Sequence, residues 1–431
     1  MINEQDLAAR FGTPLYVYDL DRVAAAYRDL RRTLPAGFTV FYSLKANPHP
    51  GIARALREAG GEPLCRAEVS SSGELDAALA AGFAPGECLY TGPGKTGPEL
   101  AAAVSRGVRT FSVESLGDLE RVGCAAARTG TAADCLLRVN QVSSQAATSI
   151  RMTGAPSQFG IDSETLPDLL PRLRTVPGTR LTGAHFYSLS NARDEASLVA
   201  ELRQSLATAG RLHRELGLPM RLLDIGGGFG APYAVPGQRP RYGRLRSELE
   251  QALDLSFPRW RSGTPQLACE SGRYLAGDCG TLITAVTNVK HSRGQRFVIV
   301  DAGINTLGGM AGLGRLMPLA ASPAGPTDRA GPGVPSGAAG PGTGTGAGPE
   351  TARLVGPLCT PGDVLGRDVP LPPLEPGDVL AIPNVGAYGP TASLLLFLGR
   401  PAPREVVVRG DEIVSVSRLD VHRAYSLPET L

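Results

Sequence analysis

The stretch TVFYSLKANPHP, residues 39–50, decides how the rest of the chain is interpreted. The apolar and β-branched run at its start favours a β-strand, Lys45 stands at the end of that run, and Pro48 and Pro50 mark a turn. The pattern GIARALREAG follows at once, with apolar residues three and four positions apart, as in an amphipathic helix. A strand that leads through a short turn into a helix is the repeating unit of parallel α/β folds.

The same unit recurs along the chain, because further β-rich runs alternate with helical patterns such as SGELDAALAAG. The predicted strands are residues 39–45, 63–69, 87–92, 109–114, 134–140, 181–188, 221–226 and 265–270. We therefore expect an α/β fold with a (β/α)8 TIM barrel over residues 25–278.

The pattern changes after residue 278, where runs such as QRFVIVDAG and GDVLAIPNVGAY alternate in the strand period between Gly and Pro turns. Residues 1–24 and 279–431 are therefore expected to form a mostly antiparallel β domain, to which TPLYVYD (13–19) adds a strand. Within it, residues 321–350 consist mostly of Gly, Ala, Pro, Ser and Thr and predict a disordered insertion. A variable surface loop and a lid over an active site are both open interpretations of that insertion.

Composition restricts the class of protein. The chain has 431 residues, 42% of them hydrophobic, and a net charge of +2, which gives no indication of a nucleic-acid or membrane partner. Its seven cysteines are odd in number and form no CxxC, which argues against a disulfide framework and a zinc site. The N-terminus lacks the layout of a signal peptide, and no apolar run reaches the ~18 residues of a membrane span. A cytoplasmic protein without a metal is expected.

Lysine is rare in this chain, since only Lys45, Lys95 and Lys290 stand among 43 basic residues. A lysine buried at a barrel strand end has a lowered pKa and can form a Schiff base with an aldehyde, whereas arginine does not deprotonate. That chemistry would explain why an ammonium is retained at Lys45. A lysine that forms a salt bridge at the barrel rim is the other interpretation.

Other polar groups fall at predicted strand ends on the same rim. The run DIGGGFG follows the seventh predicted strand. The backbone N–H groups of Gly226, Gly227 and Gly228 can bind a phosphate there, together with Arg273. A plain tight turn is the other interpretation of these glycines. A phosphate site and a Schiff-base lysine point to pyridoxal 5'-phosphate (PLP). Glu270 is then suited to the ring nitrogen and His185 to the ring face. A Glu270–Arg273 pair and a core histidine are the alternatives.

The motifs FYSLKANPHP, EVSSSGEL, SQFGI, GAHFYS, LDIGGGFG, ESGRYL, VDAGINTL, GPLCTPGD and GAYG resemble, in this order, those of the fold-type III PLP-dependent decarboxylases. This group includes the diaminopimelate, ornithine and arginine decarboxylases. The resemblance covers about residues 10–400 and implies a PLP-binding TIM barrel, an alanine-racemase-like β domain and a homodimer with shared active sites.

The resemblance also implies roles for individual residues. Lys45 resembles the cofactor-binding lysine, and the catalytic set is Lys45, His185, Glu270 and Cys359. The cofactor-binding set is Lys45, Glu68, His185, Ser188, Gly226, Gly227, Gly228, Glu270, Gly272, Arg273 and Tyr388. Cys359 and Asp363 resemble residues that reach the other subunit's site and bind substrate. Arg315 is a further candidate for a substrate carboxylate or a pantetheine phosphate, or is an exposed loop arginine.

Two departures from the family pattern concern the substrate. Members that decarboxylate diamines have an acid after the cysteine, where this chain has Thr360, and the usual HFHIGSQ is HFYSLSN here. The segments SLKAN, TGPGK, ESGRYL and GPLCTPGD are similar to carrier-protein-linked aminoacyl decarboxylases such as the butirosin-pathway glutamyl-carrier-protein decarboxylase. This similarity implies α-decarboxylation of a glutamyl or aspartyl group tethered to an acyl carrier protein, in antibiotic biosynthesis. It gives Lys95, in TGPGK, a place in the family but no role.

Three other functions stay open on this scaffold. A decarboxylase of a free amino acid, such as diaminopimelate or ornithine, is the main alternative. A racemase is disfavoured by the cysteine motif, since racemases of this fold present a tyrosine there. A non-catalytic PLP carrier is disfavoured by the second domain, which supplies GPLC and GAYG.

Overall fold

The computed structural model describes residues 3–61, 63–142, 150–151, 156–192, 194–308, 320–323 and 350–424. The chain forms two compact units, and each is described here by itself. The first comprises Leu20–Ala231 and Gln238–Asp278, and the second comprises Met1–Asp19, Pro232–Gly237 and Cys279–Leu431.

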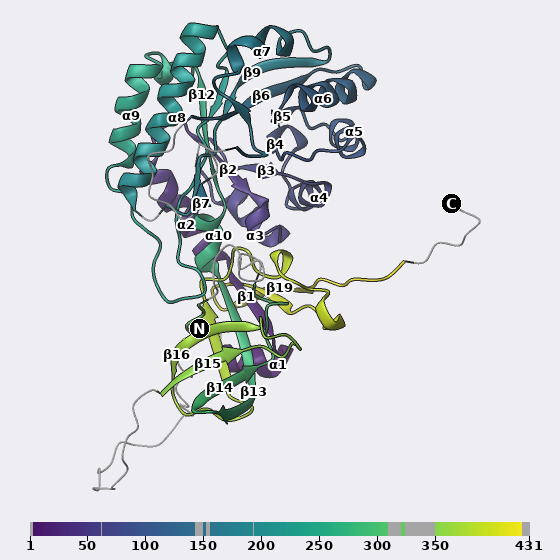
Figure 1. Ribbon diagram of the computed structural model, residues 1–431, viewed down its shortest axis with the longest axis vertical. Coiled ribbons are helices and arrows are strands. Elements are labelled where there is room, and N and C mark those ends of the chain that lie inside the picture. Colours follow the sequence, from purple (N-terminus) through teal and green to yellow (C-terminus); the bar gives the residue numbers. More distant parts are fainter. Residues whose placement is uncertain are drawn as a thin grey trace, which may run out of the picture. The chain divides into compact units, whose positions relative to one another are not determined.

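The strands of the first unit close into a parallel barrel, which confirms the TIM-barrel prediction (Figure 1). The strand order is β5-β4-β3-β2-β12-β11-β9-β6, and a pairing between β5 and β6 completes the ring. These strands are β2 (Thr39–Ser43), β3 (Arg66–Val69), β4 (Cys88–Tyr90), β5 (Thr110–Val113), β6 (Ala133–Asn140), β9 (Thr179–His185), β11 (Leu222–Asp224) and β12 (Gln266–Ser271). Each overlaps one of the runs that the sequence predicted as a strand.

Helices surround these strands, as Figure 1 shows. They are α2 (Leu20–Thr33), α3 (Pro50–Glu58), α4 (Ser72–Ala80), α5 (Gly97–Ser105), α6 (Leu116–Arg128), α7 (Leu166–Leu173), α8 (Glu195–Leu216), α9 (Leu245–Ser256) and α10 (Arg273–Ala276). Local sequence fixes several ends: Thr96 and Glu99 form a capping box on α5, and Gly217 ends α8 with φ +60. The short pieces of this unit are η1 (Leu44–Ala46), η2 (Pro85–Glu87), η3 (Trp260–Ser262), β7 (Ile150–Arg151), β8 (Ile161–Asp162) and β10 (Leu189–Ser190).

Apolar side chains fill the barrel interior. Phe41, Leu89, Leu136 and Ala268 form one buried cluster, against which Leu222 packs. Four of the five lie on alternate strands, which is the layered packing typical of a TIM barrel. The strands approach so closely at Gly183 of β9 that an added Cβ would lie 1.7 Å from the carbonyl oxygen of Leu222. This position therefore requires glycine.

The second unit contains a separate, mostly antiparallel sheet, as predicted. Its path runs β16-β15-β14-β13-β1-β18-β19, with β17 also paired to β13. The strands are β1 (Leu15–Asp19), β13 (Gly280–Ser292), β14 (Gln295–Val300), β15 (Glu350–Val355), β16 (Val364–Leu371), β17 (Val379–Pro383), β18 (Arg404–Arg409) and β19 (Glu412–Arg418). The β1–β18 and β14–β15 pairs are parallel. Helix α1 (Glu4–Phe11) buries Leu7 against Leu15, Ile283 and Val406.

Two sequence predictions about this part of the chain have different outcomes. Strand β1 joins the sheet through β13 and β18, as expected from TPLYVYD. Most of the predicted insertion lies outside the described residues, and of its ends Ala321 is buried while Glu350 begins β15. The remaining short elements are η4 (Gly277–Cys279), η6 (Pro390–Ala392) and η7 (Phe397–Gly399). In the ranges listed above, no helix has the length and apolarity needed to cross a membrane.

Candidate active site

Lys45 lies in η1, directly after strand β2, and faces a carboxylate from the neighbouring strand. Its Nζ lies 2.9 Å from Oε2 of Glu68 on β3. The Glu68 side chain is 1% exposed, whereas that of Lys45 is 37% exposed. The lysine side chain therefore pairs with a buried carboxylate and is still partly accessible, as the attachment of a covalent cofactor requires.

Two hydroxyl groups, one just after β3 and one just after β4, hold the Glu68 carboxylate in place. Oε1 accepts from the Thr91 hydroxyl at 2.5 Å and from the Ser70 hydroxyl at 3.2 Å. Burial would raise the pKa of Glu68, but the Lys45 charge and the hydrogen bonds from Thr91, Lys45 and Ser43 outweigh it and lower the pKa to about 2. Glu68 is thus a fixed negative charge beside the amine.

His185 and Glu270 meet at the ends of β9 and β12. Nε2 of His185 lies 3.1 Å from Oε1 of Glu270, and Nδ1 lies 2.7 Å from the Ser112 hydroxyl. His185 and Glu270 are 1% and 2% exposed. Asp224, at the end of β11, completes a buried group in which one ligand atom of each residue lies within 4.8 Å of the others.

The charges of this group influence one another. Burial lowers the pKa of His185, but the nearby Glu270 carboxylate and its hydrogen bond raise it above the ordinary value of histidine. For Asp224, burial and then the repulsion of Glu270 raise the pKa to about 7. Asp224 accepts a hydrogen bond from the Gly226 amide at 2.9 Å, so the acid also fixes the start of the glycine loop.

The glycine loop approaches its neighbours so closely that no side chain fits. A Cβ on Gly226 would lie 2.2 Å from the Phe186 carbonyl oxygen, and one on Gly227 would lie 2.2 Å from that of Glu270. Among the described residues, none accepts a hydrogen bond from the amides of Gly227 and Gly228. The buried Ser271 hydroxyl likewise has no partner in that part of the chain. Unused donors around a loop without side chains fit a bound anion.

Gly272 and Arg273 follow β12. A Cβ on Gly272 would lie 2.8 Å from Cβ of Ala46, so this glycine lets the β12 end pack against the turn that carries Lys45. Arg273 begins α10 and is 5% exposed. Both residues thus lie at the rim where the sequence placed them.

Ser188 faces the helix layer. Its hydroxyl accepts from Nε2 of Gln141 at 3.1 Å, and the same nitrogen donates to Ser205 of α8 at 3.1 Å. Thr208 of α8 donates to Oε1 of Gln141 at 3.1 Å. The structure therefore links Ser188 to α8, and its predicted contact with a phosphate stays a prediction.

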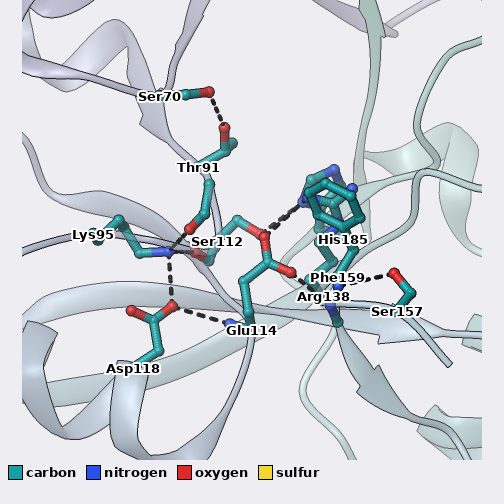
Figure 2. A network of polar contacts seen from close by, with 12 residues as sticks. Ser70, Thr91, Lys95, Ser112, Glu114, Asp118, Arg138, Ser157, Phe159 and His185 are labelled. Carbon is teal, nitrogen blue, oxygen red and sulfur yellow. Dashed lines mark hydrogen bonds and ion pairs between the residues drawn. The ribbon is translucent and has the colours of Figure 1, made fainter. Parts of the chain in front are cut away.

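Lys95, for which the sequence gave no role, is a structural cation behind the site (Figure 2). Its Nζ lies 2.7 Å from Oδ2 of Asp118, and both side chains are 1% exposed. The same ammonium donates to the carbonyls of Gly92 at 2.5 Å and Ser112 at 2.9 Å. Because Ser112 bonds His185, the Lys95–Asp118 pair supports the strand end on which His185 depends.

The remaining predicted residues belong to the second unit. Cys359 is exposed, whereas Asp363, four residues further on, is 3% exposed. The Asp363 carboxylate accepts from the amides of Ile304 at 2.8 Å and Leu358 at 2.7 Å. This carboxylate therefore shapes the Cys359 loop, and the direct substrate contact predicted for it stays untested.

Tyr388 and Arg315 complete the list of predicted residues. Tyr388 has φ 55, and its carbonyl accepts from the Tyr233 hydroxyl at 2.9 Å. Arg315 lies outside the described residues.

Sequence reasoning missed three residues of this site. Asp224 and Ser112 lie on strands that were recognised, but nothing in the sequence showed that they contact the Glu270–His185 pair. Tyr187 was noticed only as a departure from the family pattern, yet its ring centroid lies 5.3 Å from Nζ of Lys45. The strand-end rule that found Glu270 would also have found Asp224.

Comparisons with known proteins agree with this geometry. Residues 20–277 match the family model described as pyridoxal-dependent decarboxylase, pyridoxal binding domain. The chain is 33% identical over 421 residues to L-glutamyl-[BtrI acyl-carrier protein] decarboxylase of Niallia circulans, covering 96% of this chain and 92% of that protein. It is 32% identical over 412 residues to diaminopimelate decarboxylase of Methanothermobacter thermautotrophicus, covering 95% and 89%.

A solved structure shows the same architecture. Diaminopimelate decarboxylase from Helicobacter pylori, complexed with L-lysine, superposes with a TM-score of 0.78 at 26% identity and covers 96% of this chain and 95% of that one. The chain described here belongs to the pyridoxal-dependent decarboxylases. It is an enzyme that uses PLP, and the unused donors of the glycine loop, the buried Glu270 and the partly exposed Lys45 side chain fit that cofactor.

The buried Lys95–Asp118 pair gives a stability prediction. Lys95→Met leaves the Asp118 carboxylate without its buried cation, so we expect the free energy of unfolding to fall by about 3–5 kcal/mol. Chemical denaturation of the purified protein, followed by circular dichroism, measures this change.

Arg121→Met is the matched control, because Arg121 pairs with the same carboxylate at 3.3 Å but is 47% exposed. Exposed pairs contribute roughly 0–1 kcal/mol, so this variant should stay near the unsubstituted protein. Equal losses in the two variants would contradict the role assigned to Lys95.

Proposed function

We propose that this enzyme removes the α-carboxylate of an acidic aminoacyl group, of the glutamyl or aspartyl type, that is tethered to an acyl carrier protein in natural-product biosynthesis. The observation that carries this proposal is Thr360, which follows Cys359 where a diamine-specific site would have an acid. A tethered substrate has its side-chain carboxyl as a thioester, which is uncharged and needs no ionic partner. The similarity to the Niallia circulans carrier-protein decarboxylase supports the same substrate class.

The overall reaction replaces one carboxylate by one proton. The bond between Cα and the carboxylate carbon breaks, CO2 leaves, and a proton is added to Cα to give a β- or γ-amino acyl thioester. Bound PLP supplies the electron sink that accepts the bonding pair as CO2 departs. Everything else must come from side chains of the protein.

The residues divide these tasks among themselves. Lys45 is the proposed attachment point, and Glu68 keeps its amine oriented at 2.9 Å. Glu270, held by His185 at 3.1 Å, is proposed to keep the ring nitrogen protonated. The amides of the glycine loop, together with Gly272, Arg273, Ser188 and Tyr388, form the proposed phosphate-binding set. Cys359 or Lys45 is proposed to return the proton to Cα.

A free amino acid such as diaminopimelate or ornithine is the alternative substrate. The observation that favours it is the similarity to diaminopimelate decarboxylases, one of which is 32% identical over 412 residues. Diaminopimelate carries a distal ammonium, and binding it without an acid beside Cys359 would require another anionic group. The two substrate classes therefore differ in the charge of the distal group that the site must bind, which is a neutral thioester in one and an ammonium in the other.

Mass spectrometry of reaction mixtures decides between these substrates. We expect loss of CO2 from glutamyl- or aspartyl-loaded carrier protein, and kcat/KM at least tenfold lower for free glutamate, aspartate, diaminopimelate and ornithine, equivalent to about 1.4 kcal/mol of transition-state binding. Lys45→Ala is the inactive control.

Thr360→Glu tests the proposed reason, since an added carboxylate should favour a cationic substrate over the neutral thioester. The proposal would be wrong if free diaminopimelate were the better substrate of the unsubstituted enzyme.

We also propose a homodimer in which Cys359 of one copy completes the active site of the other. Cys359 is exposed on a loop that is hydrogen-bonded to the Asp363 carboxylate, so its thiol is available to a second copy.

The seven cysteines are free in the described structure, which supports a reducing, cytoplasmic location.

Mixing two variants, each first shown to be inactive alone, tests the shared sites. Lys45→Ala and Cys359→Ala homodimers each lack one residue in both sites, whereas a mixed dimer has one intact site. After dissociation and reassociation in equal amounts, we expect about a quarter of the unsubstituted activity. The absence of any recovered activity, with mixed dimers shown by native mass spectrometry, would contradict the proposal.

A further inference from the structure

His185 and Tyr187 stand two residues apart at the end of β9, and both are ring-bearing side chains close to the site. The sequence resemblance assigned the cofactor ring face to His185. A residue that stacks on a cofactor presents most of one ring face to it, so that face is open when the cofactor is absent. The exposure of the two rings therefore distinguishes them.

His185 does not have an open face in this structure. It is 1% exposed, and both ring nitrogens are engaged, Nδ1 with Ser112 at 2.7 Å and Nε2 with Glu270 at 3.1 Å. Ser112 is itself 0% exposed, and Figure 2 shows its hydroxyl beside the imidazole. Turning the imidazole toward a cofactor would leave two buried polar groups without partners, which is costly.

Tyr187 is more exposed than His185. It is half-buried, and its ring centroid lies 5.3 Å from the Lys45 amine. This distance is within the ~6 Å over which a ring face attracts a cation, so the Lys45 ammonium lies over the face of the Tyr187 ring. A cofactor ring joined to the Lys45 nitrogen would therefore begin within reach of the Tyr187 ring.

A buried cation, Arg138, lies near the Tyr187 ring. The Arg138 guanidinium lies 5.9 Å from the Tyr187 centroid and 4.7 Å from that of Phe159. Arg138 is 8% exposed and is fixed by Glu114, whose Oε1 lies 2.9 Å from its Nη1 (Figure 2). Glu114 also accepts from the Gly160 amide at 2.5 Å. The Tyr187 ring thus lies close to a buried ion pair that fixes Arg138.

We propose that Tyr187 supplies the aromatic face on which the pyridine ring of PLP rests, and that His185 acts behind it as a positioning residue for Glu270. This inference rests on the PLP-dependent reaction and on Lys45 as the attachment point. The face of a tyrosine ring is electron-rich and attracts a cation, so it suits a pyridine ring that Glu270 keeps protonated. A tyrosine also stays neutral through the pH range in which an imidazole changes charge.

The test compares PLP binding by three full-length variants. Apoprotein is titrated with PLP, and the dissociation constant and the visible circular dichroism of the bound cofactor are recorded. Tyr187→Leu removes the ring, and we expect roughly tenfold weaker binding and a much smaller dichroic band. Tyr187→Phe keeps the ring and should bind within about twofold of the unsubstituted protein.

His185→Gln is the competing variant, because glutamine can still donate to Glu270 but has no ring. The inference requires a smaller loss of affinity and dichroism in this variant than in Tyr187→Leu. Far-ultraviolet circular dichroism of every variant checks that the barrel is folded. If Tyr187→Leu does not fold, Tyr187→Met takes its place as the variant without a ring.

Two results would overturn the inference. One is wild-type PLP affinity and dichroism in Tyr187→Leu together with a large loss in His185→Gln. The other is a loss in Tyr187→Phe as large as in Tyr187→Leu, since the phenyl ring would then not suffice. Failure of the unsubstituted protein to bind PLP would overturn the cofactor assignment itself, and the inference with it.

Discussion

The ion pair between Lys45 and Glu68 is the interaction on which the rest of the site depends. A primary amine must stand at the end of β2, close enough to a fixed negative charge to be oriented and open enough to react. Glu68 meets the first requirement because Thr91 and Ser70 hold its carboxylate and its pKa is lowered to about 2. Adjacent parallel strands β2 and β3 bring the two residues together. The fold therefore creates the pair simply by placing these strand ends side by side.

Behind that pair, the barrel rim is built from buried polar groups that bond one another. Lys95 with Asp118, Arg138 with Glu114 and His185 with Glu270 form three such pairs. The Arg138–Glu114 pair joins β6 to the residue after the neighbouring strand β5, and the His185–Glu270 pair joins β9 to β12. The Lys95–Asp118 pair joins the loop after β4 to helix α6. Buried charges are tolerated only when they are paired and hydrogen-bonded, and removing one partner is strongly destabilising. These three buried pairs therefore hold polar side chains in place around the candidate cofactor site.

The barrel was predictable because it follows from local periodicity. Each strand run and each helical pattern is a short stretch of sequence, and Lys45 stood out because lysine is so rare here. The contacts within the site were not predictable, since Ser112 and His185 are 73 residues apart and nothing local indicates that they meet. For the same reason the sequence placed His185 and Ser188 at the rim but not the direction in which each side chain faces. The role of Lys95 likewise required its buried partner Asp118 to be seen.

The most direct test of the account is to locate the covalent link. The purified enzyme is supplied with PLP and reduced with borohydride, and its peptides are analysed by mass spectrometry. The three lysines make the outcome clear, since Lys95 is buried in an ion pair and Lys290 is exposed on β13 of the other unit. The account predicts a single pyridoxyl adduct on Lys45. An adduct on Lys95 or Lys290 alone, or no adduct at all, would contradict it.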